Sequence, residues 1–316
     1  MRLWLSPAWL SLTALPLASQ VLSSQSRDTN PVKLSGYIQA RETYQSSIGL
    51  TGSINRARLA VSGDVVEDVT WRIQGEFRTG SGGTGRATVS LQDAYVRYAP
   101  ASWALQMGQF KTPFSREFIT SLADLETADR ATVVDSLAPK RDIGIMGEYT
   151  YRIANLWVGV FNGDGQNVTA NSDSTMLGVA RVALRALPGL SLAANGARYF
   201  GDSTRYGVDM AYEASGITVK GEYLGQTRDG ATGPDDWGWY ALAGILPVPL
   251  VQAVGKYEEF VRRAVTSTLK TRVWTVGLNL YPHGRNLRLT FDYASRMIGE
   301  PRVRKGRLLA QVQAKF

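Results

Sequence analysis

The sequence predicts an all-β protein that folds as a closed, antiparallel transmembrane β-barrel of about 16 strands. Three observations lead to this fold class. Apolar and polar residues alternate along many segments of about ten residues. Short and long connectors alternate between these segments, and the last segment is amphipathic and ends on an aromatic residue. Backbone polar groups find no water in hydrocarbon, so only helices and closed barrels can span a membrane.

The first residues have the pattern of an export signal. Arg2 precedes an apolar stretch, and small residues follow at Ala18 and Ser19. We therefore expect residues 1–23 to be a cleaved signal peptide and residues 24–316 to be a single barrel domain. No later segment approaches about 18 uninterrupted apolar residues, so we expect no helical membrane span.

The composition excludes several classes of site. The chain has no cysteine, which rules out thiol chemistry and cysteine-ligated metals. It carries 35 basic against 27 acidic residues, but the basic residues are spread singly rather than gathered in runs. A nucleic-acid-binding protein would concentrate them in a patch. We expect no nucleic acid, cofactor or metal.

A period of two is clearest in residues 69–78, whose odd positions are apolar and whose even positions are polar. Successive side chains of a strand point to opposite faces, so such a segment has one lipid-facing and one lumen-facing side. The register is ambiguous in residues 190–200 and 248–260. The same alternation recurs in residues 217–223, 274–280 and 287–293.

The final strand has the same two faces. Leu308, Val312 and Phe316 lie on its apolar side, whereas Gln311 and Gln313 lie on its polar side. A last strand of this kind, ending on Phe, is typical of outer-membrane barrels.

The connectors between strands also indicate a barrel with two different ends. Short turns at one end and long loops at the other are typical of outer-membrane barrels, and an even strand number places both termini in the periplasm. One connector, at residues 201–203, is shorter than this order predicts. We expect tight connectors at residues 63–68, 99–101, 187–189, 215–216, 247–249 and 281–284, and roomy ones at residues 79–86, 110–141, 162–174, 226–236, 261–270 and 295–305.

A soluble all-β protein, such as a propeller or a sandwich stack, would also explain the alternation. It does not explain the connector lengths, the terminal Phe or the aromatic residues near strand ends, which suit the interfacial girdles of a membrane protein. We therefore expect a multi-pass barrel in the outer membrane of a Gram-negative cell. The expected girdle residues are Trp237, Trp239, Tyr240, Tyr281 and Tyr293.

The longest connector, residues 110–141, follows the fifth expected strand. A water-filled barrel of this strand number is too wide to discriminate solutes unless something narrows it. The connector is too apolar for a solvent-exposed loop, so we expect it to fold inward as the third extracellular loop and dock on the inner wall. Its apolar residues are Phe114, Phe118, Ile119, Leu122, Leu125, Val133, Val134 and Leu137.

Four stretches of sequence lie in and around this connector: residues 91–96 (LQDAYV), 108–117 (GQFKTPFSRE), 137–144 (LAPKRDIG) and 159–163 (GVFNG). Their order and spacing resemble the phosphate-selective porins, also called the porin O/P family. Outside residues 90–165 the likeness is limited to the strand rhythm and the terminal Phe. The resemblance implies a homotrimer of sixteen-stranded barrels, each with an inward third loop and with inward Arg and Lys side chains that guide anions.

Basic residues on the lumen side of the expected strands favour an anion path. Facing lipid, each would cost about 2–4 kcal/mol at mid-bilayer. A channel narrower than the Debye length of about 8 Å screens them poorly, and guanidinium offers phosphate two parallel donors. We expect Asp93 to orient neighbouring arginines. The expected constriction and anion path consists of Lys111, Ser115, Arg116, Arg130, Lys140, Arg141, Arg56, Arg58, Arg72 and Asp93.

Acidic residues offset part of this charge. The connector at residues 110–141 holds five acids and five bases, and further acids are expected on the lumen side of the strands. A mild anion preference is therefore a safer expectation than high phosphate selectivity. We expect some bases of the connector to pair with its acids and hold its shape.

Together these features predict an outer-membrane porin for passive diffusion of small hydrophilic solutes, with a preference for anions such as phosphate. The alternatives are a barrel with an enzymatic role and one with a structural or adhesive role. Acid–base chemistry on Ser needs a His, and the only one, His283, lies in an expected tight turn, so we expect no enzyme. The expected partners are small anionic or hydrophilic solutes, outer-membrane lipid and lipopolysaccharide, and further copies of the chain.

Overall fold

The computed structural model describes residues 31–78, 87–169, 171, 175–230, 235–264, 267–299 and 303–316. The expected signal peptide, residues 1–23, lies outside the described residues. The strands are β1 (Lys33–Gln45), β2 (Gly49–Val66), β3 (Val69–Arg78), β4 (Thr88–Tyr98), β5 (Trp103–Lys111), β6 (Arg141–Tyr151), β7 (Ala154–Phe161), β8 (Leu177–Leu187), β9 (Leu190–Tyr199), β10 (Ser203–Ala214), β11 (Ile217–Arg228), β12 (Asp236–Val248), β13 (Val251–Ala264), β14 (Ser267–Leu280), β15 (Pro282–Arg285), β16 (Leu287–Ile298) and β17 (Val303–Lys315). The helices are α1 (Arg116–Ile119) and α2 (Thr132–Leu137).

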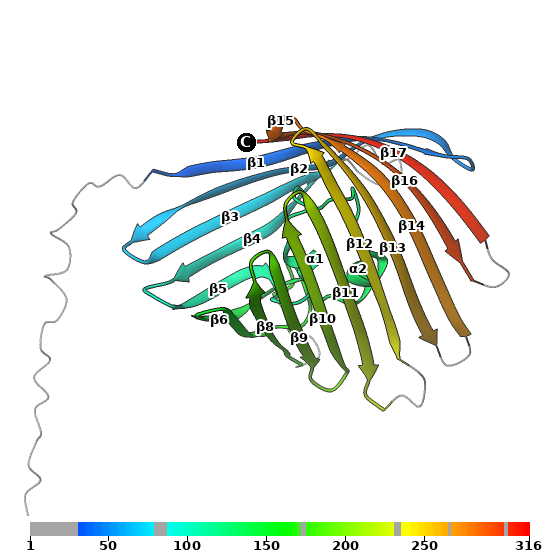
Figure 1. Cartoon of the computed structure of the whole chain (residues 1–316). Helices are drawn as coiled ribbons and strands as arrows, with labels where there is room; N and C mark the ends of the chain where they lie inside the picture. Colours follow the sequence, from blue (N-terminus) through cyan, green and yellow to red (C-terminus); the bar gives the residue numbers. More distant parts are fainter. Residues whose placement is uncertain are drawn as a thin grey trace, which may run out of the picture.

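Sixteen of these strands form a closed antiparallel barrel, which confirms the predicted fold class. Each strand pairs with its neighbour along the chain, while the short β15 lies in the connection between β14 and β16. The ring closes where β1 pairs with β17, from Tyr37 opposite Lys315 to Gln45 opposite Arg307. Figure 1 shows the strands in chain order around the wall. Closure pairs every strand edge, as a hydrocarbon environment requires.

Phe316 takes part in this closure. Its backbone nitrogen donates to the Gly36 carbonyl at 3.0 Å, and its carbonyl accepts from the Gly36 nitrogen at 2.9 Å. A Cβ atom on Gly36 would lie 2.9 Å from the Phe316 ring, so the absence of a side chain at Gly36 gives the ring its room. The aromatic residue therefore packs at the seam between the first and last strands.

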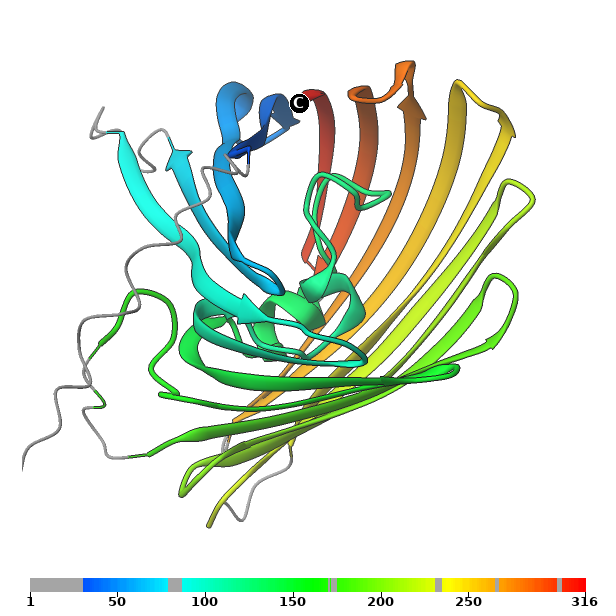
Figure 2. The same cartoon turned by 90° about the vertical axis from the view of Figure 1, so that its left-hand side faces the viewer.

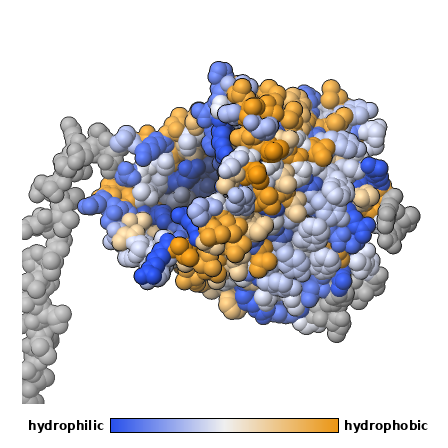
Figure 3. All heavy atoms as spheres, in the orientation of Figure 1, coloured by the Kyte–Doolittle hydropathy of each residue, from blue (hydrophilic) through white to orange (hydrophobic). Residues whose placement is uncertain are grey.

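The two faces of the strands meet different surroundings. Outward side chains such as Ile73 in β3 and Val312 in β17 are apolar and exposed, whereas their neighbours Gln74 and Gln313 point inward and are buried. The expected alternation of these two strands is therefore correct. Figure 3 shows apolar residues over much of the outer surface and a hollow lined by hydrophilic residues.

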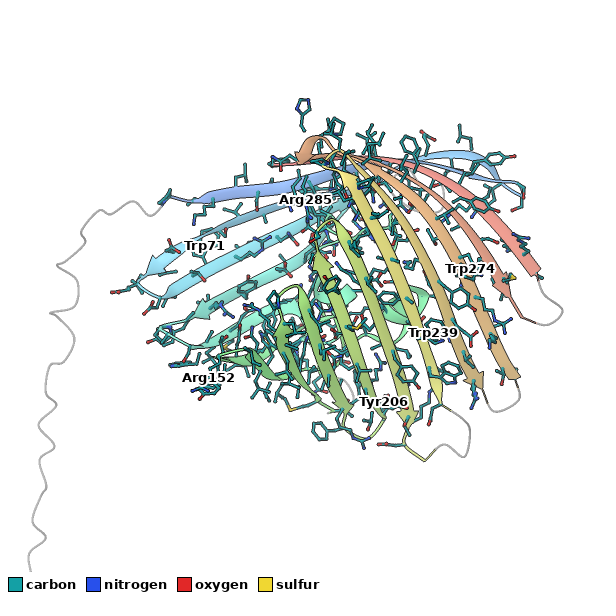
Figure 4. All side chains as sticks on the ribbon, in the orientation of Figure 1. Trp71, Arg152, Tyr206, Trp239, Trp274 and Arg285 are labelled. Carbon is teal, nitrogen blue, oxygen red and sulfur yellow. The ribbon has the colours of Figure 1, made fainter. Side chains whose placement is uncertain are left out.

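Aromatic side chains form a belt on the outer wall over β12 to β14. Tyr257 lies between Trp239 and Trp274, with ring centroids 5.2 Å and 4.4 Å away. Figure 4 shows the two labelled tryptophans on neighbouring parts of this wall. Rings of this kind favour the membrane interface, so the belt marks the edge of the apolar band.

Two expected girdle residues, Tyr240 and Tyr281, do not join the belt. Tyr240 is buried, and its hydroxyl donates to Glu222 Oε2 at 3.5 Å. Tyr281 donates to Gln252 Oε1 at 2.8 Å. Both of these partners face the lumen. Tyr240 points inward because it directly follows the outward Trp239, and successive side chains of a strand point to opposite faces.

Residues 112–140, hereafter the internal segment, connect β5 to β6 and lie inside the ring of strands, as Figure 2 shows. The expected limits of 110–141 are each too wide, since Lys111 ends β5 and Arg141 begins β6. Ser115 caps α1: its Oγ accepts from Phe118 N at 3.2 Å. Among the described residues, no helix is long and apolar enough to cross a membrane.

The second helix of the internal segment approaches the wall closely at β12. A Cβ atom on Gly238 would lie 2.9 Å from the Val133 side chain, so Gly at this position lets α2 pack against the strand. Val133 and Val134 are both fully buried. The contact fixes the position of the internal segment relative to the wall.

Two connectors are shorter than the sequence predicts. Strand β13 continues to Ala264 and β14 begins at Ser267, where a roomy loop over 261–270 is expected. Likewise β16 and β17 extend into the expected loop at 295–305. The polar residues there belong to strand ends that extend beyond the apolar band. Some of them form ion pairs on the outer face: Glu259 contacts Lys270 at 2.7 Å and Arg272 at 3.1 Å.

Candidate functional site

Apolar side chains dock the internal segment on the lumen side of the wall. Phe114, Val134 and Leu137 pack with Leu224 and Phe260, which come from β11 and β13. Seven of the eight apolar residues expected to dock are buried. The segment therefore covers part of the inner wall and leaves the rest open.

This covered patch explains the ambiguous register of residues 248–260. The lumen-facing side chains of β13 include Val254 and Phe260, which are buried under the internal segment. Both faces of the strand are partly apolar, because protein rather than water lies on its inner side. An alternation of inward polar and outward apolar side chains therefore cannot identify such a strand.

Carboxylates of the inner wall hold the backbone of the internal segment. Asp292 Oδ2 accepts from Ala128 N at 2.8 Å, and Glu258 Oε2 accepts from Thr132 N at 2.7 Å. Glu222 does the same for another backbone amide, at 3.2 Å. All three carboxylates are buried. These acids lie behind the segment, against the wall it covers.

The acids of the internal segment are also engaged by the wall. Asp129 binds Arg41 at 2.8 Å and Arg307 at 2.5 Å, and Glu126 binds Lys220 at 2.7 Å. Burial by itself would raise the pKa of Asp129, but the two guanidinium groups outweigh burial and lower it to about 2. A third acid, Asp124, contacts Lys315 at 2.9 Å. These ion pairs tie the segment to β1, β11 and β17.

One acid of the segment stays largely exposed. Asp135 lies 3.8 Å from Arg130, with most of its side chain open to solvent. Lys140 donates to the Asp135 carbonyl, and burial lowers the pKa of Lys140. Asp135 is therefore the acid that offsets most of the charge of these two bases.

Three of the expected path residues surround one aromatic ring. Lys111, Arg130 and Lys140 lie 5.6, 4.9 and 5.8 Å from the centroid of the Phe118 ring. Cations placed near the face of an aromatic ring are attracted to it without losing their charge. Burial lowers the pKa of Arg130 to about 10, which leaves it cationic at neutral pH.

Backbone carbonyls supply most of the hydrogen-bond acceptors for these cations. Lys111 Nζ donates to the carbonyls of Ile119 and Thr120 at 3.0 and 2.8 Å. Arg130 Nε donates to the Glu117 carbonyl at 3.3 Å. A carbonyl satisfies a donor but cancels no net charge.

A cavity of about 260 Å³, hereafter the smaller cavity, lies between the end of α1 and the wall of β2 to β6. Asp93 accepts from Arg141 Nε at 2.7 Å and lies 3.9 Å from Arg72, while Arg58 pairs with Glu76. The charged residues that line this cavity are four bases and one acid: Arg58, Arg72, Lys111, Arg141 and Asp93.

A second cavity of about 550 Å³, hereafter the larger cavity, is lined by Arg56 and Arg130 together with residues of β13 to β17. Lys111 of the smaller cavity and Arg130 of the larger one both lie beside the Phe118 ring. The charged residues of the larger cavity are Arg56, Arg130, Lys256, Arg296, Lys305, Arg307, Asp129, Asp135, Glu258 and Asp292.

Arg56 has unused hydrogen-bond donors. Its Nε and one terminal nitrogen are shielded from solvent, and among the described residues they have no hydrogen-bond partner. A buried donor without a partner costs about 1–3 kcal/mol. An anion that entered beside Arg56 would supply the missing acceptor.

Three expected path residues line neither cavity: Lys140, which lies beside the Phe118 ring, and also Ser115 and Arg116. Ser115 is fully buried, and its backbone nitrogen donates to Asn195 Oδ1 at 3.3 Å. Arg116 Nε donates to Asp209 Oδ1 at 2.7 Å, and Asp209 also binds Arg181 at 2.6 Å. Ser115 and Arg116 anchor the internal segment to β9 and β10 in the structure.

Glu117 is the most deeply enclosed acid of the internal segment. Its Oε2 accepts from Ala131 N at 2.7 Å, and its other oxygen lies 3.7 Å from Lys256 Nζ. Burial raises its pKa to about 7, although Lys256 favours the ionised form.

Sequence reasoning missed the wall residues that hold the internal segment, chiefly Arg41, Lys256 and Glu258. Arg41 lies in a strand whose odd positions face inward, so its alternation was a usable signal. Lys256 and Glu258 fall in the stretch of ambiguous register. In the described part of the chain, no group of three or more acidic or histidine side chains is placed to hold a metal ion.

Comparison with known families gives one match. The family described as phosphate-selective porin O and P matches residues 36–220. This range covers β1 to β10, the internal segment and all the charged residues of the smaller cavity. No curated protein sequence matches the chain significantly.

Several solved structures share the barrel. The outer membrane channel DcaP of Acinetobacter baumannii is 15% identical, with a TM-score of 0.67 over 90% of this chain and 97% of that one. The anion-selective porin from Comamonas acidovorans is 13% identical, with a TM-score of 0.65 over 91% and 100%. OmpT of Vibrio cholerae, in its trimer form, is 10% identical, with a TM-score of 0.66 over 91% and 99%. At these identities the likeness concerns the fold.

Proposed function

The chain belongs to the family of phosphate-selective porins O and P and is thus an outer-membrane porin, and on this premise we propose that its lumen favours small anions such as phosphate. Solutes pass by diffusion through the larger and smaller cavities. The proposed activity requires no catalysis and no cofactor. The residues proposed to border the path are Arg56, Arg58, Arg72, Lys111, Arg130, Lys140, Arg141 and Asp93.

The separation of charge across the lumen is the observation that carries this proposal. The wall acids Glu222, Glu258 and Asp292 are buried and bind backbone amides of the internal segment, and Glu258 and Asp292 also line the larger cavity. The bases of β2 to β6 line the open side, where Asp93 is the one acid of the smaller cavity. The near balance of acids and bases in the sequence therefore does not describe the smaller cavity, while the larger cavity keeps four acids against six bases.

The geometry adds to the attraction. The bases line a space partly enclosed by protein, where ions screen them less than on an exposed surface. Low-dielectric walls focus the field and raise the local concentration of anions. Arg56 offers donors that no described group uses.

Replacing Arg56 with Gln tests the proposal. A unit charge about 4 Å from a passing ion is worth about 1 kcal/mol in water, or about fivefold in occupancy. We expect Arg56→Gln to lower the chloride-to-potassium permeability ratio by about that factor, measured as the reversal potential in a potassium chloride gradient. Added phosphate should reduce the chloride current of the wild-type channel more than that of the variant.

Two further variants control for folding and for net charge. Arg56→Lys keeps the charge and should retain most of the permeability ratio. Arg198→Gln removes a base that pairs with Asp229 at 2.5 Å near the end of β9, outside both cavities, and should leave the ratio unchanged. A wild-type channel that prefers potassium and ignores phosphate would overturn the anion preference.

We also propose that the porin is a homotrimer whose subunits meet near β1 and β2. Glu42 of β1 points outward, next to the inward and buried Arg41, and among the described residues it forms no ion pair or hydrogen bond. Its carboxylate lies over Gly52, where a Cβ atom would come within 2.8 Å of Oε1.

An unpaired carboxylate is costly on a face covered by lipid. The outer residues that extend beyond Glu42 toward the β1–β2 turn, Tyr44, Ile48 and Leu50, are apolar and strongly exposed. Two outer grooves of about 480 and 720 Å³ adjoin Glu42. A second copy of the chain could fill these grooves and supply a donor. The rest of the outer face is proposed to contact outer-membrane lipid and lipopolysaccharide.

A further inference from the structure

The smaller cavity has an apolar side as well as a cationic one. Ile119, Phe110 and Met146 line it together with the bases of β2, β3 and β6. Ile119 is the one apolar residue expected to dock the internal segment that stays exposed, at 38%. Its side chain therefore contributes to the cavity rather than to the packing of the segment.

Tyr95 joins the two sides of this cavity. Its ring meets Phe110 edge to face, with centroids 6.0 Å apart. Among the described residues its hydroxyl has no hydrogen-bond partner, and the residue is only partly buried. The cavity thus presents an aromatic wall, a free phenol group and several cations within about 260 Å³.

These surroundings suit different anions unequally. Inorganic phosphate or acetate can use the cations but gains little from the apolar wall. An anion with a hydrocarbon body can use both, because burial of about 40 Å² of apolar surface at about 25 cal/mol per Å² corresponds to about fivefold in binding. The volume also exceeds what a bare oxyanion needs, which leaves room for such a body.

We propose that the smaller cavity selects organic anions in which one carboxylate or phosphoryl group is joined to a compact apolar body. The anionic group lies among Arg72, Lys111 and Arg141, with Tyr95 as an additional donor. The apolar body lies against Ile119, Phe110 and Met146. This inference rests on the proposed anion-conducting function and specifies its substrate class.

Benzoate and acetate are the probes that test this inference, because they share a carboxylate and differ in the apolar body. Planar-bilayer recordings would measure the concentration of each that halves the chloride current of the full-length porin. For the wild type we expect benzoate to act at a concentration at least about fivefold lower than acetate. Phosphate at pH 7 should resemble acetate more than benzoate.

Substitutions at Ile119 separate the cavity from general hydrophobic adsorption. Ile119→Asn should bring the benzoate and acetate values close together, while Ile119→Leu should keep them apart. Because Ile119→Asn could disturb the internal segment, its chloride-to-potassium permeability ratio must match the wild type for the comparison to count. Tyr95→Phe, which removes only a hydroxyl, should weaken both anions equally.

The outcomes distinguish this inference from the function on which it rests. Equal benzoate and acetate values in an anion-selective wild-type channel, or an unchanged preference in Ile119→Asn, would refute the organic-anion site and leave the porin function intact. A wild-type channel with no anion preference would instead refute the proposed function.

Discussion

Backbone groups decide what several charged residues of the lumen can do. Lys111 and Arg130 donate to carbonyls, which leave their charge uncancelled, whereas Glu222 and Asp292 accept from amides of the internal segment and are buried. The basic and acidic side chains of the lumen are similar in number, but they therefore lie in different places. The electric field in the open space depends on which charged groups line it. A substitution of one such group should therefore have a large effect on ion selectivity.

Glu117 should make the internal segment sensitive to pH. Burial raises its pKa from about 4.5 to about 7, so the docked segment favours the protonated form. The stabilisation that protonation provides is complete below about pH 4.5 and is lost as pH rises through about 7. Lys256, Glu258 and Arg130 also face this carboxyl and modulate it. We expect more frequent current fluctuations at pH 9 than at pH 6 in single-channel recordings.

The matched variant for this prediction is Glu117→Gln, which keeps the shape and removes the titration. Its fluctuations should be the same at both pH values and should resemble the wild type at pH 6. An equally large pH response in Glu117→Gln would show that another group is responsible.

At the scale of elements, the internal segment is held from one side. Its ion pairs and amide contacts reach β1, β10, β11, β13, β16 and β17, and its apolar side chains cover the wall between β6 and β13. The larger cavity lies beside the anchoring strands β13, β16 and β17, and the smaller cavity lies beside β2 to β6. The position of the pore is therefore a consequence of where the segment is anchored.

Removal of one anchor should widen the pore. Asp129→Asn weakens the contacts to Arg41 and Arg307, which an ionised Asp129 maintains because its pKa is about 2. The expected loss of stability is small, about 1 kcal/mol or less, since the side chain is partly exposed and its pairs are screened. Single-channel conductance should therefore rise.

The barrel itself should be unaffected by this change. Heat-dependent migration in detergent gels would confirm that the Asp129→Asn barrel is folded. A conductance equal to the wild type in a folded barrel would mean that the remaining contacts hold the segment without Asp129.

Across the molecule as a whole, Glu42 departs from the apolar pattern of the outer surface among the described strand residues. Most outward residues of the described strands are apolar, and the charged group Glu259, Lys270 and Arg272 is paired. Glu42 has no such partner in the described part of the chain. The proposed subunit contact accounts for this difference, whereas contact with lipid does not.

The variant Glu42→Leu distinguishes a subunit contact from a lipid contact by the sign of its effect on stability. If a second subunit covers this face, the variant should lose a contact and its trimer should dissociate at a lower temperature in detergent gels. If lipid covers it, replacement of an unpaired carboxylate by Leu should stabilise the barrel by about 1 kcal/mol or more.

Cross-linking provides an independent measurement, because the chain has no cysteine. Single cysteines at Tyr44 should form intersubunit cross-links if β1 lies in the contact. Cysteine at Val208, on the outer face of β10, serves as the control and should not. The reverse pattern would move the proposed contact to another part of the wall.

The sequence by itself determined the closed barrel, its strand number and the inward or outward direction of most strand residues. These properties follow from the period-two alternation, which fixes what each face can contact. The alternation failed in β13, because part of the lumen side is covered by protein and its residues are apolar. Tyr240 was wrongly assigned to the girdle, because it was assigned by its place near a strand end and not by the alternation. The polar ends of β13 and β14, which form ion pairs, were also wrongly predicted to be a loop.

The tertiary structure decided which charges remain in the open path. Glu258 and Asp292 are sequence neighbours of no residue in the internal segment, yet they bind its backbone. Likewise, Ser115 and Arg116 share a motif with Lys111 but anchor the segment, while Lys111 faces the smaller cavity. Such contacts join residues more than 75 positions apart. Local periodicity carries no information about them, because they depend on how the segment packs inside the closed wall.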